Sequence, residues 1–300
     1  MHSSYVVTDP KGVILVNVGK VLQKGPLVKN AKGEMVREPY DIKIFNTINF
    51  KKSLHYNPFA YLKTEKDIME FLNMLMANTQ KEGASSGDPF WEEAEKLLLS
   101  ALVSYLIFEA PIEEQNFAMI MEMLNAFEVR EEDESFKNAI DYLFEDLEEE
   151  NPTHYAVLQY KLFKLAAGKT AKSILISIAA RLAPFNINEV KEITSYDELE
   201  LDTLGDKRTA LFVIISDMDK TFNFLVAIMY SQLFKGLCEK ADEEYGGELP
   251  YKVRFILDEF ANIGKIPDFK EKMATIRSRG LSVTMILQAK AQIKDIYKEA

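Results

Sequence analysis

Short, continuously apolar runs separated by stretches with helical spacing constrain the fold of this chain more than any other feature. In the last third of the sequence such runs occupy 210–216, 253–257 and 281–287, and the intervening stretches 222–240 and about 268–279 are typical of helices. A strand without polar alternation is usually covered on both faces. Repeated strand–helix–strand units of this kind predict a parallel sheet covered by helices.

The beginning of the chain is expected to contribute strands to the same sheet. A β-branched run at 5–8 ends in the turn Asp9-Pro10-Lys11-Gly12, and a second strand is predicted at 42–45. Between them, 12–23 is weakly helical and 24–40 is predicted to form a loop or a small hairpin.

The middle of the chain contains only helical patterns. Asp88-Pro89 is a typical helix start, because a capping residue precedes a proline in the first turn. We therefore expect an α/β protein with sheet-forming parts at 1–63 and 196–300 and an inserted all-helical domain at 64–195. Further helices are predicted at about 112–127, 133–149, 152–167 and 169–183.

The composition is that of an ordinary globular protein. The formal net charge of −11 over 300 residues argues against a protein that coats DNA with its whole surface. The single cysteine, Cys238, excludes an internal disulfide, and no Cys/His spacing indicates zinc. The longest uncharged apolar run, 97–108, is too short to cross a bilayer, and Met1 does not begin a signal peptide. We expect the segment to be soluble.

The strongest local signal for chemistry is a pair of carboxylates after an apolar strand. Residues 253–257 lead directly into Asp258 and Glu259. In open parallel sheets ligands bind outside the carboxyl ends of the strands. A nucleotide site needs one acid there to hold Mg²⁺, often through water, and a second to orient the attacking water. Asp258 suits the first role and Glu259 the second; the alternative is that both acids only end the strand and solvate its turn.

The surrounding sequence resembles the type IV secretion coupling proteins, ATPases that feed DNA or protein into a conjugation channel. The stretch from Leu257 to Gln288, including Asp258-Glu259-Phe260-Ala261-Asn262-Ile263-Gly264, resembles the Walker B segment of that family and the strand that follows it. The resemblance covers nearly the whole chain. Further motifs in the family's order are Val7-Thr8-Asp9-Pro10-Lys11-Gly12, Asn57-Pro58-Phe59, Phe90-Trp91 and the stretch from Ala167 to Ser173.

The resemblance implies roles for two more residues. Arg277 resembles the family's candidate arginine finger, which reaches the nucleotide of a neighbouring subunit; the alternatives are that it caps a helix or that Arg279 is the finger. Gln288 ends the strand next to Walker B and resembles a sensor of the γ-phosphate, the alternative being a loop glutamine. Asp9 and Lys11 either line the same crevice or only form a turn.

Gly168-Lys169-Thr170 looks like the end of a phosphate-binding loop but does not satisfy its pattern. That loop requires a glycine five residues before its final glycine and a preceding strand, whereas position 163 is Phe and 155–165 is helical. In the resembled family the loop lies upstream of the strand at 5–8, and membrane helices precede it. We therefore expect a segment that lacks the loop, ends within the motor fold, and neither binds ATP tightly nor hydrolyses it.

For the parent protein, the resemblance implies a RecA-like motor that uses ATP and Mg²⁺ at the cytoplasmic face of the bacterial inner membrane. Its implied partners are a relaxase or effector protein, single-stranded DNA, the secretion channel and copies of itself in a ring, expected to be a hexamer. The acidic stretch 128–150 is either a solvated helical face or a docking surface for a basic protein. Two alternative functions for the chain remain: it is a fragment of another FtsK/HerA-like DNA translocase, or it is a non-enzymatic substrate-docking module.

Overall fold

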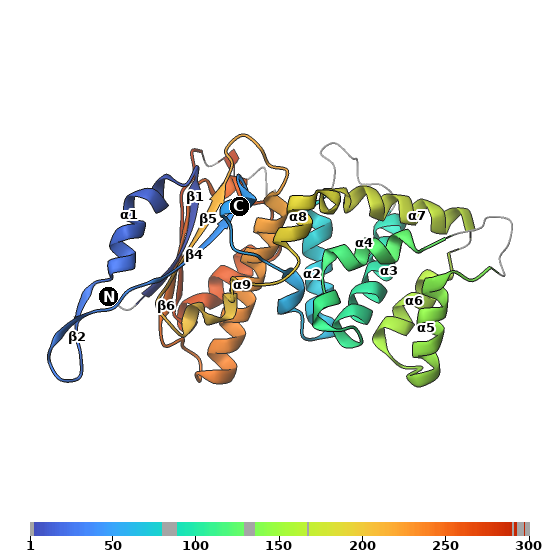
Figure 1. Cartoon of the computed structure of the whole chain (residues 1–300), viewed down its shortest axis with the longest axis horizontal. Helices are drawn as coiled ribbons and strands as arrows, with labels where there is room; N and C mark the ends of the chain where they lie inside the picture. The colour runs from blue at the N-terminus through green and yellow to red at the C-terminus, as the bar shows by residue number, and fades with distance from the viewer. Residues whose placement is uncertain are drawn as a thin grey trace. The chain divides into compact units, whose positions relative to one another are not determined.

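The computed structural model of the chain (Figure 1) divides into two compact units, which we describe separately. The sheet unit comprises Met1–Tyr56 and Asp197–Ala300, and the helical unit comprises Asn57–Tyr196. The structure describes residues 3–79, 89–128, 136–166, 168–289, 291–292 and 297.

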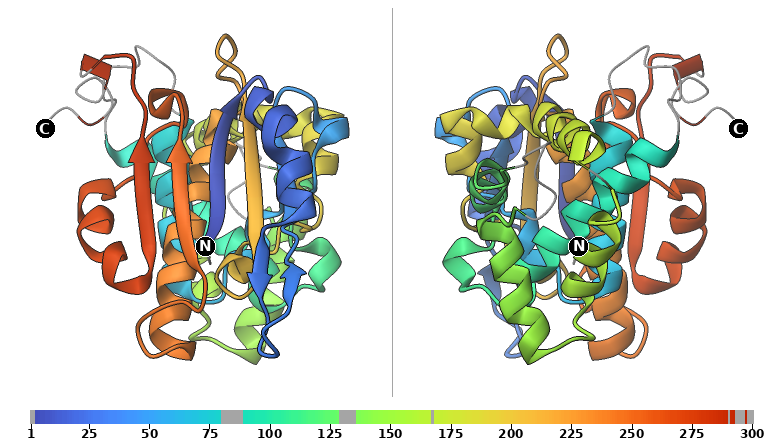
Figure 2. Two further views of the ribbon diagram at one scale, coloured as in Figure 1. Left: turned by 90° about the vertical axis from the view of Figure 1, so that its left-hand side faces the viewer. Right: turned by 90° about the vertical axis from the view of Figure 1, so that its right-hand side faces the viewer.

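The sheet unit is built on five strands that all run parallel, as the sequence predicts. Their order is β4-β5-β1-β6-β7, and the arrows in Figure 2 point the same way. β5 is buried along its whole length, which explains its unbroken apolar sequence. The strands are β1 Ser3–Pro10, β4 Asp41–Asn46, β5 Thr209–Ile215, β6 Lys252–Leu257 and β7 Leu281–Met285.

Helices cover both faces of this sheet. α1 (Val13–Lys24) lies on one face and α9 (Asn223–Glu244) on the other (Figures 1 and 2). Val7 and Phe212 pack with residues of α1, whereas Thr8 forms a hydrogen bond of 2.7 Å with Tyr230 of α9. The alternation of side chains along β1 thus supplies both layers of the core.

The helix predicted at 268–279 is interrupted. α10 (Phe269–Thr275) is followed by the 3₁₀ turn η7 (Ile276–Arg279), and Gly280 ends the segment with a left-handed φ of 84°. Glycine adopts this conformation at little steric cost, so the predicted stop at Gly280 is confirmed. The other 3₁₀ turns are η1 Phe50–Lys52, η2 Pro58–Tyr61, η3 Ile112–Glu114, η4 Ala183–Asn186, η5 Leu201–Gly205 and η6 Phe260–Asn262.

The segment predicted to be a loop or a small hairpin forms the hairpin. β2 (Leu27–Lys29) pairs antiparallel with β3 (Met35–Arg37). The Asn30 side-chain oxygen accepts hydrogen bonds from the backbone N–H groups of Lys32 and Glu34 at 2.9 Å each, which closes the turn.

The helical unit contains no strand within its described residues. Its helices are α2 Glu65–Asn78, α3 Pro89–Phe108, α4 Phe117–Asn125, α5 Ala139–Glu150, α6 Tyr155–Phe163, α7 Gly168–Arg181 and α8 Asn188–Ile193. The predicted cap Asp88 and the predicted helical residues 133–135 lie outside the described residues. In the described ranges, none of the chain's helices has both the length and the apolar character needed to cross a membrane.

Aromatic packing and local caps explain why the helical unit folds. Phe117 stacks on Phe185 with ring centroids 3.6 Å apart, and Phe59 meets Phe117 edge-on at 5.1 Å. α2 and α5 each begin with a capping box, formed by Thr64 with Asp67 and by Asn138 with Asp141.

Two short segments of the sheet unit meet where the chain passes to and from the helical unit. The backbone N–H of Glu198 donates to the carbonyl of His55 at 2.9 Å. The Glu198 carboxylate in turn accepts from the His55 backbone N–H at 2.9 Å and contacts its Nδ1 at 2.7 Å. The two crossing points are therefore held side by side.

Gly25, which lies between α1 and the hairpin, has no room for a side chain. It has φ 70°, and a Cβ at this position would lie 2.0 Å from the backbone oxygen of Glu38. We expect Gly25→Ala to lower the free energy of unfolding by more than about 3 kcal/mol, measured by urea denaturation. Gly33 is the matched control, because its φ is 82° but a Cβ there meets nothing within 4 Å. Gly33→Ala should cost only about 1 kcal/mol, and equal losses would contradict the steric explanation.

Asp141 is expected to make the stability of the helical unit depend on pH. It is buried and accepts hydrogen bonds from Lys164 Nζ at 2.7 Å, Tyr160 at 2.8 Å and the Asn138 backbone N–H at 2.9 Å. Burial alone would raise the pKa of Asp141, but the hydrogen bonds and the charge of Lys164 outweigh it and lower that pKa.

A carboxyl group with a lowered folded pKa stabilises the fold above its ordinary pKa, about 4, and loses this contribution as pH falls through the folded pKa. We expect Asp141→Asn to lower the free energy of unfolding by about 2 kcal/mol at pH 7. The difference in free energy of unfolding between the variant and the wild type should become smaller below about pH 4. Thermal unfolding of both proteins across pH measures this. The exposed Asp146 of the same helix is the control, and Asp146→Asn should show no such narrowing.

Candidate functional site

The parallel sheet brings the carboxyl ends of its strands to one edge, and polar residues follow four of them. Lys11 follows β1, Asp217 follows β5, Asp258 and Glu259 follow β6, and Gln288 comes three residues after β7. Residues predicted from separate parts of the sequence therefore lie along the same edge, where ligands bind in folds of this type.

The chain reverses its direction across the sheet between β1 and β6. From β1 it passes through α1 toward β4, whereas from β6 it passes through α10 to β7 on the opposite side. Because β1 and β6 are neighbours, the connections diverge at their carboxyl ends, and ligands bind at such switch points in folds of this type. Lys11 and Glu259 stand at this switch point.

The turn after β6 holds Glu259 in an unusual backbone conformation. Glu259 has φ 49° and ψ 47°, in the left-handed region, and its backbone N–H donates to Asp258 Oδ1 at 3.0 Å. Such a conformation costs a non-glycine residue about 1 kcal/mol and is concentrated at functional sites. Both side chains are half-buried. Hydrogen bonds of Ile286 N–H to the Leu257 carbonyl and of Phe260 N–H to the Ile286 carbonyl fasten the turn to the segment after β7.

Lys11 supplies positive charge beside this turn. Its Nζ lies 2.7 Å from Asp217 Oδ2. The pKa of Lys11 is raised, chiefly by the hydrogen bond and the charge of Asp217 and to a smaller degree by the charge of Glu259. Lys11 thus lies within electrostatic reach of Glu259. It also has a left-handed φ of 70°, so β1 and β6 both end in strained non-glycine residues.

Asp9 has a structural role and does not line the crevice. It is fully buried, and its Oδ1 and Oδ2 accept the backbone N–H groups of Ile14 at 3.0 Å and Leu15 at 2.7 Å. Both oxygens are therefore used to satisfy the first turn of α1, which has no side-chain cap from Gly12. Of the two explanations that the sequence allows for Asp9, the turn is correct.

Arg277 lies at the opposite edge of the sheet. It belongs to η7, immediately before β7, whereas Gln288 follows β7. The five residues of β7 span about 16 Å. One chain therefore does not bring Arg277 to its own Asp258 and Glu259.

The two candidate finger residues differ in their surroundings. Arg277 is exposed, and within the described part of the chain its guanidinium group makes no hydrogen bond or ion pair; only its backbone carbonyl accepts one, from the N–H of Gly280 at 3.2 Å. Arg279, in contrast, donates from Nε to both carboxylate oxygens of Asp242 at 2.9 Å and from Nη2 to Oδ2 at 2.6 Å. Of these two guanidinium groups, that of Arg277 is the one without a partner among the described residues.

Gln288 is exposed at the carboxyl edge, and its backbone N–H donates to Gln292 Oε1 at 3.1 Å. Within the described residues, no hydrogen bond joins its side chain to Asp258 or Glu259. The structure thus places Gln288 at the same edge as the two acids, with no hydrogen bond between its side chain and theirs among the described residues.

Sequence reasoning missed Asn262 and Asn223. Asn262 Nδ2 donates to Glu259 Oε2 at 2.8 Å, and Asn223 Nδ2 donates to the carbonyl of Asn262 at 2.5 Å. An asparagine three residues after a candidate acid in a tight turn is a signal that could have identified Asn262. Asn223 comes from a distant part of the chain and had no such signal.

The carboxyl edge suits Mg²⁺ bound together with a nucleotide. No group of three or more His, Cys, Asp or Glu side chains able to hold a metal occurs within the described ranges. Mg²⁺ at nucleotide sites needs only one or two carboxylates, because phosphate oxygens and water complete its shell. Asp258, half-buried at the end of β6, fits that requirement.

Gly168-Lys169-Thr170 starts α7 in the helical unit, and the preceding element is the helix α6. No strand leads into it among the described residues before it, so the structure agrees that this sequence is not a phosphate-binding loop.

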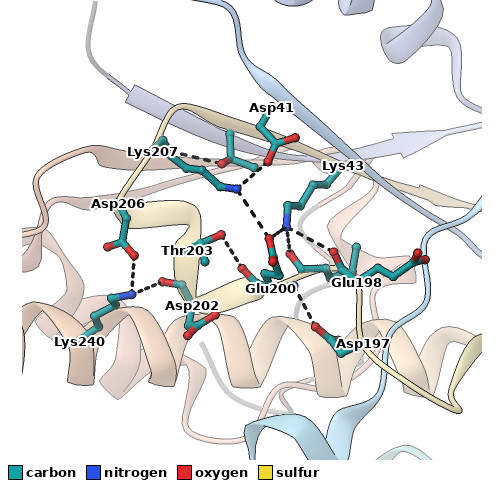
Figure 3. Close-up of polar contacts among 12 residues, drawn as sticks. Asp41, Lys43, Asp197, Glu198, Glu200, Asp202, Thr203, Asp206, Lys207 and Lys240 are labelled. Carbon is teal, nitrogen blue, oxygen red and sulfur yellow. Dashed lines mark hydrogen bonds and ion pairs between the residues drawn. The ribbon is translucent and has the colours of Figure 1, made fainter.

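A second polar cluster, at the amino edge of the sheet, has a structural explanation (Figure 3). The buried Lys43 donates from Nζ to the Leu199 carbonyl at 2.7 Å, the Glu198 carbonyl at 3.3 Å and Glu200 Oε2 at 2.7 Å. Lys207 bridges Asp41 at 2.9 Å and Glu200 at 3.7 Å. Every donor of the Lys43 ammonium is satisfied, so this cluster fixes the return of the chain to β5.

Comparison with known proteins identifies the relatives of the chain. A family model described as "Type IV secretory system Conjugative DNA transfer" matches residues 2–300. A search of curated proteins found no match.

Solved structures share the fold. The chain is similar to "Bacterial conjugative coupling protein TrwBdeltaN70" in its unbound form, with 14% sequence identity and a TM-score of 0.57 over 98% of this chain and 57% of that chain. It is also similar to plasmid coupling protein TrwB with the ATP analogue ADPNP (15% identity, TM-score 0.58, 98% and 59% covered) and with ADP and Mg²⁺ (15%, 0.57, 98% and 58%). The chain spans less than two thirds of these structures. The likeness establishes an α/β RecA-like fold.

Asp9 and the exposed acids of the same edge should differ in how much they contribute to the free energy of unfolding. We expect Asp9→Asn to lower the free energy of unfolding by about 2 kcal/mol, because an amide accepts only one of the two N–H groups. Urea denaturation followed by circular dichroism measures the change. The control is Asp217→Asn, on an acid paired with the exposed Lys11, which should leave stability unchanged; an equally large loss there would contradict the capping role of Asp9.

Proposed function

We propose that this chain, which belongs to the type IV secretory system conjugative DNA transfer family, forms part of an ATP-driven coupling protein that recruits and moves transfer substrates to a secretion channel. The observation that carries the proposal is the strand β6, which delivers Asp258 and Glu259 to the carboxyl edge of a RecA-like sheet at its switch point.

In this proposal the two acids divide the work of ATP hydrolysis. Asp258 would hold Mg²⁺ through water, and a bound Mg²⁺ would supply positive charge to offset that of the phosphates. Glu259 orients and deprotonates the attacking water. Lys11, paired with Asp217, contributes positive charge beside Glu259, and Gln288 senses the γ-phosphate.

The phosphates need a further binding element. The 300 residues contain no Gly-x-x-x-x-Gly-Lys-[Ser/Thr] sequence, and such a loop supplies most of the grip on the β- and γ-phosphates. We propose that the 300 residues alone neither bind ATP tightly nor hydrolyse it, and that the activity belongs to the parent protein.

Arg277 is proposed to act on the nucleotide of a neighbouring subunit. It is exposed and lies at the opposite edge of the sheet, about 16 Å from its own carboxyl edge. A cation at that place can approach a γ-phosphate only across an interface between copies. This favours a ring, for which we propose a hexamer, and it favours Arg277 over Arg279, which is held by Asp242.

The helical unit is proposed to dock the transfer substrate, a relaxase or an effector protein, while single-stranded DNA is moved by the ring. The described part of α5 carries exposed acids, including Glu149 and Glu150. An acidic face repels DNA and suits a basic protein partner. The parent protein would act at the cytoplasmic face of the bacterial inner membrane.

Mixing inactive subunits tests both catalytic assignments. In the coupling protein that carries this segment and a phosphate-binding loop, Glu259→Gln and Arg277→Ala should each lower kcat by about two orders of magnitude. If Arg277 acts across the interface, an equimolar mixture should regain about a quarter of wild-type turnover, because about one interface in four combines an intact Glu259 with an intact Arg277. Steady-state phosphate release from reassembled rings is the measurement.

Arg279→Ala is the matched control for this experiment. It removes a cation two residues away and should destabilise the contact with Asp242 while leaving most of the turnover. Mixed rings that remain inactive would contradict action across the interface, and full activity of Glu259→Gln would contradict the proposed catalytic role of the β6 turn.

A further inference from the structure

Asn262 donates two hydrogen bonds to Glu259. Its backbone N–H donates to the Glu259 carbonyl at 2.7 Å, and its side-chain Nδ2 donates to Glu259 Oε2 at 2.8 Å. The first bond already closes the 3₁₀ turn that follows β6. The second bond is therefore not needed for the backbone of the turn and acts on the carboxylate itself.

The chemistry of an amide suits the control of a carboxylate that must act as a base. The NH₂ group of asparagine donates a hydrogen bond but brings no charge, so it directs Glu259 without forming an ion pair with it. The other carboxylate oxygen, Oε1, has no hydrogen bond within the described part of the chain. One oxygen is thus anchored and the other is left for a water molecule.

Asn262 is itself held by a second asparagine. Asn223 Nδ2 donates to the Asn262 carbonyl at 2.5 Å, and Asn223 is buried at 7% exposure as the first residue of α9. A buried amide with a satisfied donor has little freedom to rotate. The chain of contacts therefore runs from the start of α9 through Asn262 to Glu259.

The connection between β5 and α9, residues 216–222, is linked to two neighbours of Glu259, namely Lys11 and Asn262. It contributes Asp217, which pairs with Lys11, and it leads directly into Asn223. Its own turn is ordered, because Ser216 Oγ accepts the backbone N–H groups of Met218 at 3.1 Å and Asp219 at 3.0 Å. The connection thus contacts Lys11 through Asp217, and the residue that follows it, Asn223, contacts Asn262.

We infer that Asn262 is a positioning residue for Glu259 and that Asn223 fixes Asn262, so that the β5–α9 connection sets the orientation of the proposed base. This inference rests on the proposed function of Glu259. It assigns no contact with ATP to either asparagine: both act only through the carboxylate.

The test compares two ways of removing the donor: Asn262→Asp replaces it with a carboxylate oxygen and adds a negative charge beside Glu259, whereas Asn262→Ala removes it without adding a charge. In the parent coupling protein, Asn262→Asp keeps the shape of the side chain and the backbone bonds but loses the NH₂ donor. We expect kcat to fall about tenfold while the affinity for a fluorescent, non-hydrolysable ATP analogue changes less than about twofold. Asn262→Ala should behave similarly, and Asn223→Ala should lower kcat about threefold.

A coupled measurement separates positioning from a structural role. In the Glu259→Gln background, Asn262→Asp should not lower the residual single-turnover rate further, because its effect passes through the carboxylate. A further loss of the same size in that background would overturn the inference. A variant that fails to fold is recognised by its melting temperature, and Asn262→Ser, which restores a hydroxyl donor on a short side chain, then serves in its place and should regain part of the lost kcat.

The outcomes also distinguish this inference from the proposed function. If Glu259→Gln abolishes turnover but Asn262→Asp leaves kcat unchanged or raises it, the positioning role is wrong and the function stands. If Glu259→Gln retains full turnover, the proposed function fails, and the positioning inference fails with it.

Discussion

The pairing of β1 with two parallel neighbours organises the sheet unit. β1 hydrogen-bonds to β5 on one side and to β6 on the other, with Thr8 in register with Val213 and with Leu257. This double pairing satisfies its backbone groups and leaves its side chains for the two helical layers. It also aligns the ends of three strands at one edge, so that the turn residues after β1, β5 and β6 become neighbours although they are far apart in sequence.

The helices follow from that arrangement. Asp9, near the end of β1, anchors the start of α1 on one face, and Thr8 contacts Tyr230 of α9 on the other. The chain leaves β1 and β6 in opposite directions, so that Lys11 and Glu259 follow two paired strands at the point where the connections diverge. The chemistry proposed for this edge therefore depends on topology first and on the individual acids second.

Much of this architecture could be predicted from local patterns. Unbroken apolar runs identified β5 and β6, Gly280 marked the end of a helical segment, and the acids after β6 were found because they follow a buried strand. Strand order could not be predicted, since it depends on contacts such as that between Tyr5 and Ala210. Backbone conformation was equally hidden: nothing in the sequence around Glu259 indicates a left-handed residue.

The candidate site shows the same limit. The sequence could not distinguish Arg277 from Arg279, because the difference lies in Asp242, on another helix. It could not assign a role to Asp9 either, since the same local sequence is compatible with a buried helix cap and with an exposed turn residue. Patterns of one residue type within a single element are visible in a sequence, whereas contacts between elements that are distant along the chain appear only in the fold.

The hydrogen bonds between His55 and Glu198 have a consequence for how the chain folds. Strands β4 and β5 are adjacent in the sheet but separated by the entire helical unit, so their pairing requires a very long loop to close, at a cost in entropy that slows folding. Helices that form early from local contacts shorten the effective length of that loop. Because the two ends of the insertion meet at His55 and Glu198, a helical unit that collapses first would deliver β4 and β5 to each other, and the order of folding would run from the middle of the chain outward.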